Sequence, residues 1–83
     1  MREVTYAQMN KVLSSLGFTM RVVTVENKLR VYEHAAAGAR LALAFRPDND
    51  MVLPHHMGAV QGTLKVYGIA DPLDFAVELQ KAS

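Results

Sequence analysis

Two expected strands carry side chains that could bind a nucleic acid if they shared one sheet face. Alternation along positions 29–34 and 39–46 groups Arg30, Tyr32, His34, Arg40 and Arg46 on one side. We expect that side to face solvent, because the alternate apolar residues of both strands should face the helices. Arginine pairs with phosphate, and a tyrosine ring can stack on a base. The same face also fits a plain solvated sheet surface, or a homo-oligomer interface built on Ala42 and Ala44.

A second candidate site is the histidine pair His55 and His56, which we expect just before a helix of residues 57–67. Backbone N–H groups at a helix start attract anions, so a phosphate could bind there with help from one imidazole. The alternative is that both residues only cap a helix start led by Pro54. Adjacent histidines rarely bind one zinc ion and the chain has no cysteine, so we expect no metal and no other cofactor.

The elements that would position these residues can be read from periodicity and capping signals. Tyr6, Met9, Leu13 and Leu16 form one stripe of a helix over 5–16, and Thr5 with Gln8 fits a capping box. Strands are expected at 18–26, 29–34 and 39–46, with a short extended piece at 51–53. Helices are expected at 57–67 and 71–81. The sequence therefore predicts one α+β domain over 1–83, with order α-β-β-β-α-α and a three-stranded antiparallel sheet covered by helices on one face.

Composition limits the functional classes. The 83 residues are 51% hydrophobic, and the net charge of +1 gives no strong overall attraction to RNA, so any RNA-binding charge must gather on one face. We expect a cytoplasmic protein with no membrane segment, because no secretory signal is visible and the longest apolar run, 41–45, is short. Some of the apolar surplus should be buried against a partner or another copy.

Several short motifs resemble the HicA family, the toxin subunits of HicA–HicB toxin–antitoxin modules. They are Leu16-Gly17-Phe18 at the end of the first helix, Tyr32-Glu33-His34 in the hairpin, Leu53-Pro54-His55-His56, Gly62-Thr63-Leu64 and Gly68-Ile69. The resemblance implies a fold like that of double-stranded-RNA-binding domains and a HicB-like antitoxin partner. It also implies metal-independent cleavage of messenger RNA in active members.

The chain departs from this family at the catalytic position. The family's histidine follows Gly-Ser in the hairpin, and the matching stretch here, 27–30, contains neither the Gly-Ser pair nor a histidine. His34 is the candidate substitute, with Arg30 beside it for the phosphate and Lys28 as a further RNA contact. Three readings stay open: an RNA-binding domain with lost or weakened ribonuclease activity, a non-catalytic protein-interaction or oligomerisation module, and a metal-independent ribonuclease that uses His34.

Overall fold

The computed structural model describes residues 4–82 and confirms the predicted α+β class and element order. Its elements are α1 (Tyr6–Ser15), β1 (Thr19–Thr24), β2 (Lys28–His34), β3 (Ala39–Ala44), α2 (Pro54–Val66) and α3 (Pro72–Lys81). The three strands form one antiparallel sheet in the order β1-β2-β3, so β2 is central and the other two strands are edges.

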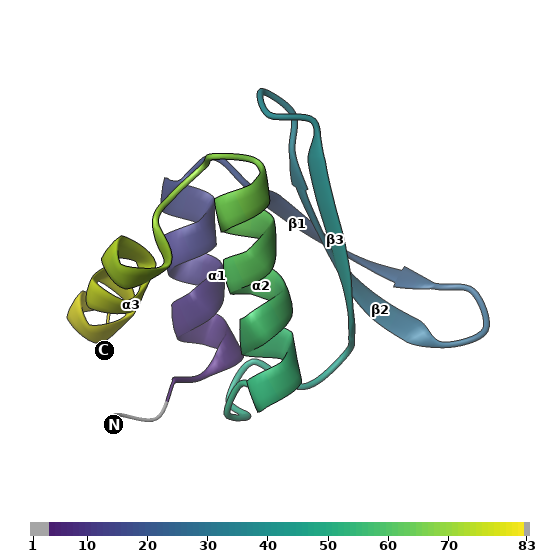
Figure 1. Ribbon diagram of the computed structural model, residues 1–83. Coiled ribbons are helices and arrows are strands. Elements are labelled where there is room, and N and C mark those ends of the chain that lie inside the picture. The colour runs from purple at the N-terminus through teal and green to yellow at the C-terminus, as the bar shows by residue number, and fades with distance from the viewer. Residues whose placement is uncertain (1–3, 83) are drawn as a thin grey trace.

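The helices form a layer on one face of the sheet (Figure 1). Helix α1 packs against β1, α2 packs against β3, and α3 packs against both other helices. The predicted capping box at the start of α1 is confirmed, since Thr5 and Gln8 bond reciprocally. The core between the helices and the sheet contains Tyr6, Met9, Leu13, Phe18, Tyr32, Leu43, Val60, Leu64, Phe75 and Leu79.

The far end of the β1–β2 hairpin extends beyond the helices (Figure 1). Val22 in β1 is 44% exposed, Val25 in the connecting turn is 82% exposed, and Met20 is also exposed. All three side chains are apolar and exposed to solvent. The hairpin therefore presents hydrophobic surface that the monomer leaves in water.

Helix α2 begins at Pro54, three residues before the predicted start. Proline suits this first helical position, because its fixed φ fits a helix and its missing N–H would have had no partner there. The prediction that His55 and His56 precede the helix is therefore wrong, because both lie in its first turn. The start of α3 is as predicted, with Asp71 accepting from the Leu73 N–H and Pro72 in the first position. Among the described residues, no helix has the length and apolar character that a membrane span requires.

Candidate functional site

In strand β2, the row of residues predicted to face solvent faces the helices instead. Directly opposite residues in an antiparallel pair share a face, and Arg30 lies opposite Leu43 while Tyr32 lies opposite Leu41. Leu43 and Tyr32 belong to the core, so this row faces the helices. Arg30 is 0% exposed and Tyr32 is 1% exposed. The prediction of a solvent-facing surface containing Arg30, Tyr32 and His34 is therefore wrong.

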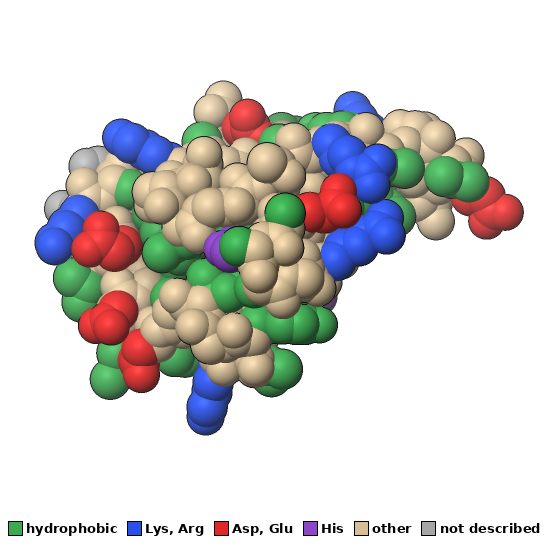
Figure 2. All heavy atoms as spheres, turned by 90° about the horizontal axis from the view of Figure 1, so that it is seen from above, with side chains coloured by type: hydrophobic (Ala, Val, Ile, Leu, Met, Phe, Trp, Pro, Cys, Tyr) green, Lys and Arg blue, Asp and Glu red, His purple; other side chains and the backbone are tan. Residues whose placement is uncertain are grey.

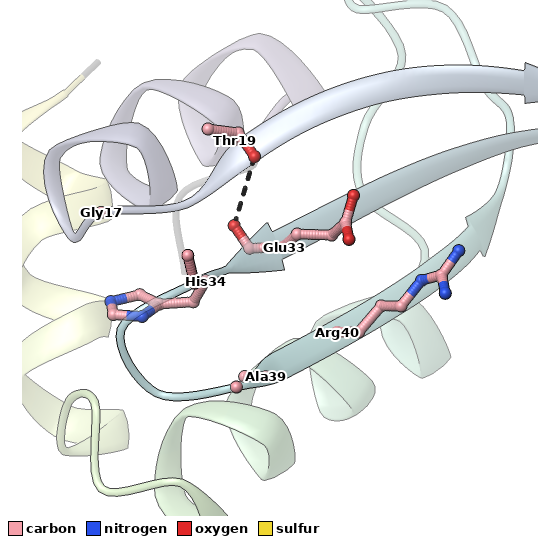
Figure 3. A pocket seen from close by; sticks show the side chains of 8 residues that line it. Gly17, Thr19, Glu33, His34, Ala39 and Arg40 are labelled. Atoms are coloured by element: carbon pink, nitrogen blue, oxygen red, sulfur yellow. Dashed lines mark hydrogen bonds between the residues drawn. The ribbon is translucent and has the colours of Figure 1, made fainter.

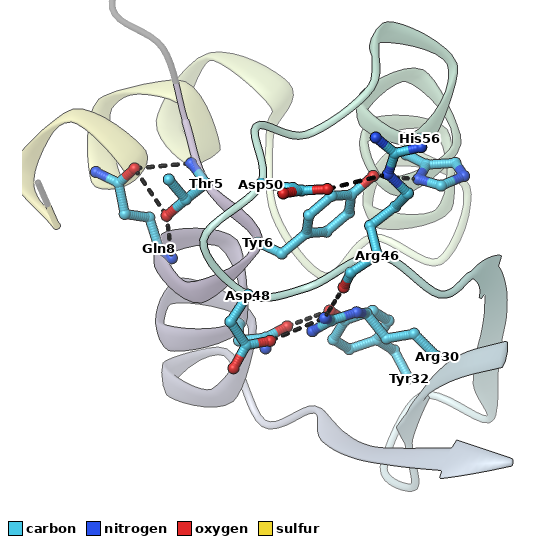
Figure 4. Close-up of polar contacts among 10 residues, drawn as sticks. Thr5, Tyr6, Gln8, Arg30, Tyr32, Arg46, Asp48, Asp50 and His56 are labelled. Atoms are coloured by element: carbon cyan, nitrogen blue, oxygen red, sulfur yellow. Dashed lines mark hydrogen bonds and ion pairs between the residues drawn. The ribbon is translucent and has the colours of Figure 1, made fainter. Parts of the chain in front are cut away.

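Arg30 can be buried because the surrounding chain supplies partners for its guanidinium (Figure 4). Its Nη2 donates to the Arg46 carbonyl oxygen at 2.7 Å and to Asp48 Oδ1 at 2.8 Å. The rings of Tyr6 and Phe45 lie 5.0 and 5.2 Å from its Cζ, within cation–π range. Burial acts against its charge, but the interactions with Asp48 and Tyr32 outweigh it and raise the pKa of Arg30.

Tyr32 is tied to the same network through its hydroxyl. It accepts from Arg30 Nη1 at 3.4 Å and donates to Asn10 Oδ1 in α1. Burial raises the pKa of Tyr32 and outweighs the opposing effect of Arg30, so the hydroxyl stays protonated. Within residues 4–82, Arg30 Nε has no hydrogen-bond partner. The two side chains thus connect β2 to α1 and to the segment after β3, and neither ring nor guanidinium reaches the surface.

His34 lies at the corner where α1 ends. Its Nε2 is 2.9 Å from the Leu16 carbonyl oxygen, and its Nδ1 accepts from the Ala37 N–H at 3.1 Å. Because Nδ1 accepts a hydrogen bond, these contacts fit the tautomer in which Nε2 carries the proton and donates it to the Leu16 carbonyl. A Cβ at position 17 would lie 2.9 Å from Nε2, and φ there is +103°, so glycine is required for this approach.

A shallow hollow beside this corner is lined by Gly17, Thr19, Glu33, His34 and Arg40 (Figure 3). The imidazole lies toward Gly17, whereas the Glu33 and Arg40 side chains point elsewhere. The catalytic role of His34 stays a prediction, and it would require the ring to exchange one of its two backbone contacts for a substrate.

The two histidines of α2 have different environments. His55 is exposed, while His56 is buried and its Nδ1 lies 2.5 Å from the Tyr6 hydroxyl. That hydroxyl also accepts from the Leu53 N–H at 3.3 Å, so Tyr6 contacts the start of α2 at two points. Burial, with smaller contributions from His55 and Arg46, lowers the pKa of His56. His56 therefore fastens the start of α2 to α1.

The exposed cations do not form one group. Arg40 lies opposite Glu33 near one end of β2, while Lys28 is at the other end, roughly 16 Å away at strand spacing. Lys28 lies over the Phe45 ring at 4.1 Å, and Arg46 pairs with Asp50 at 3.3 Å. Within residues 4–82, Arg40 has no ion pair or side-chain hydrogen bond. The structure therefore leaves Arg40 apart from Lys28, while Arg46 is close enough to His56 to affect the pKa of that imidazole.

Sequence reasoning missed an apolar groove of about 280 Å³ between α2 and α3. It is lined by Val4, Met57, Gln61, Ala76, Val77, Leu79 and Gln80. A sequence signal for the groove was present in α3, where Leu73 and Val77 form a second apolar stripe besides that of Phe75 and Leu79. In the structure, Phe75 and Leu79 are buried, whereas Leu73 and Val77 are exposed. Within residues 4–82, no three histidine or acidic side chains come together as a metal site would require.

Comparisons of this chain with protein-family models, with curated proteins and with solved structures return no match.

Proposed function

We propose that this chain is a divergent HicA-like domain that acts as a non-catalytic protein-interaction module, and that the α2/α3 groove receives an apolar segment of its partner. The burial of Arg30 and Tyr32 carries this proposal, because the two residues best suited to reading RNA serve the interior of the fold. The surface instead exposes several large apolar side chains, which are typical of a protein-interaction site.

The groove suits an amphipathic helix or an extended apolar segment. Its walls are mostly aliphatic, with the amides of Gln61 and Gln80 among them. Leu73, 77% exposed, continues the apolar stripe of α3 beyond the groove, next to the hollow formed with Lys65 and Gly68. Peptide grooves of this kind take apolar anchors spaced three or four residues apart.

The charge around α3 favours a basic partner segment. Asp71, Asp74 and Glu78 are exposed, whereas Lys81 is the only basic residue of that helix. Figure 2, in which left and right are as in Figure 1, shows acidic side chains beside hydrophobic ones at the left, where α3 lies. A partner with apolar anchors flanked by lysine or arginine would match this rim. A HicB-like protein, the partner implied by the family resemblance, is the first to test.

The test is co-expression of the tagged chain with a HicB-like protein encoded by a neighbouring reading frame, followed by measurement of the complex. Val77→Glu puts a charge into the groove wall and should abolish co-purification. Val66→Glu is the matched control, because Val66 is also exposed on a helix, at 80%, but lies outside the groove. Equal binding by the two variants would remove the groove from the proposal, and the absence of such a reading frame would count against this partner.

RNA binding at the start of α2 is a second candidate. One observation favours it: Arg46 lies close enough to His56 to lower its pKa, beside the exposed His55 and the free N–H groups of the first turn. Lys28 also lies over the Phe45 ring, at 4.1 Å from its centroid. Lys28→Glu combined with Arg46→Glu should then abolish a salt-sensitive gel shift with single-stranded RNA, while Val77→Glu should leave it unchanged.

A further inference from the structure

Strand β1 is an edge strand without the usual protection against pairing. Within residues 4–82, it pairs only with β2, so its other side presents unpaired backbone groups over six residues, 19–24. It contains no proline, and its one charged residue, Arg21, is drawn toward β2 by an ion pair with Glu33 at 2.9 Å. Natural edge strands are commonly protected by free charges, prolines or bulges. The other edge strand, β3, exposes no large hydrophobic side chain, whereas β1 exposes Met20 and Val22.

We infer that β1 pairs antiparallel with β1 of a second copy, which joins the two sheets into one of six strands. This surface is separate from the α2/α3 groove and does not depend on it. A two-fold axis perpendicular to the sheet places one residue opposite its own copy and keeps each side chain on its original face. Only two such registers pair five of the six strand residues, one centred on Arg21 and the other on Val22.

Charge decides between these registers. Centring on Arg21 would place two arginines directly opposite each other, which destabilises a strand pair. Centring on Val22 places Val22 opposite its copy, Met20 opposite Thr24, and Arg21 opposite Val23. Val22 and Met20 of both copies then gather on the helix side of the sheet, where the monomer exposes both side chains to solvent. The exposed Val25 of the turn comes opposite Thr19 of the partner strand, so its side chain also gains cover.

The absence of cysteine from the chain makes the register directly testable. Directly opposite residues have Cα atoms about 4.5–5.5 Å apart, which lies within the range that a disulfide spans. A Val22→Cys variant should therefore form a disulfide-linked dimer on mild oxidation. The controls are Arg21→Cys, whose copy lies out of register, and Val66→Cys on α2; both should crosslink far more slowly. Equal crosslinking of all three variants would overturn the inference.

The unmodified protein supplies an independent measurement. Its mass by light scattering should rise from 9.2 kDa toward twice that value as concentration increases. Val22→Lys, which adds an edge charge, should stay monomeric, while Val66→Lys should dimerise like the parent chain. A parent chain that stays monomeric at every concentration would refute the edge pairing. Because this measurement contains no partner protein, that result would leave the groove proposal standing.

Discussion

The buried Arg30 makes the stability of the fold depend on a carboxylate that is mostly in water. Asp48 has a side chain 61% exposed, yet its Oδ1 accepts a 2.8 Å hydrogen bond from a guanidinium that is 0% exposed. In Asp48→Ala, Arg30 would keep only the Arg46 carbonyl at 2.7 Å and the Tyr32 hydroxyl at 3.4 Å. The substitution should therefore destabilise the protein, because it removes the anion that pairs with a buried cation.

The magnitude follows from the unequal burial of the pair. Removing one partner of a fully buried ion pair costs about 3–5 kcal/mol. Water reaches Asp48, so the loss should be nearer that of one hydrogen bond to a charged group, about 1.5–3 kcal/mol. For a domain of this size that corresponds to a fall in Tm of roughly 6–24 °C. Asp50→Ala is the control: its ion pair with Arg46 is exposed on both sides and should contribute no more than about 1 kcal/mol.

A double-mutant cycle tests the cause. Arg30→Met replaces the cation by an unbranched apolar side chain, so Asp48→Ala should cost less than about 0.5 kcal/mol in that background. Urea unfolding followed by circular dichroism gives the four free energies of unfolding. If Asp48→Ala were equally costly with methionine at position 30, the Arg30–Asp48 bond would not be the source of the stability, and the reasoning would fail.

Three further predictions concern the buried His56 and two glycines. The pKa of His56 is lowered, so between about pH 6.5 and the lower folded-state pKa the unfolded chain holds more protons. The free energy of unfolding should thus fall as pH drops through this window, by at most about 1.4 kcal/mol per pH unit for this group. His56→Gln should flatten this profile, measured by urea unfolding at several pH values. Gly17→Ala should destabilise by about 1–3 kcal/mol, because the new Cβ meets His34 at a positive φ. Gly62→Ala in α2, where a Cβ meets nothing within 4 Å, should instead stabilise by about 0.5–1 kcal/mol in the same thermal melts.

The element order was predictable from sequence because its signals are local. The Thr5–Gln8 capping box, the Asp71-Pro72 helix start and the alternation of β3 each specify structure within a few residues, and the structure contains all three. The start of α2 was missed although its signal was also local. Pro54 fits the first helical position, and placing it there would have moved both histidines into the helix.

The faces of β2 were not predictable by the same reasoning. Both sides of this strand mix apolar and polar residues, so alternation alone does not decide which one is buried. The decision depends on partners far along the chain: Asn10 for Tyr32, and Arg46 and Asp48 for Arg30. Arginine and tyrosine have long apolar parts that pack well once their polar ends have partners. The close approach of Gly17 and His34 was likewise not predictable, because the two residues belong to separate motifs that are far apart in the sequence.

The most direct test of the proposed function is a side-by-side titration of the chain with its HicB-like partner and with single-stranded RNA, at one salt concentration. We expect that the partner binds, that Val77→Glu abolishes this binding, and that RNA gives no saturable signal. Saturable RNA binding that Lys28→Glu with Arg46→Glu removes, together with no binding of the partner, would contradict it.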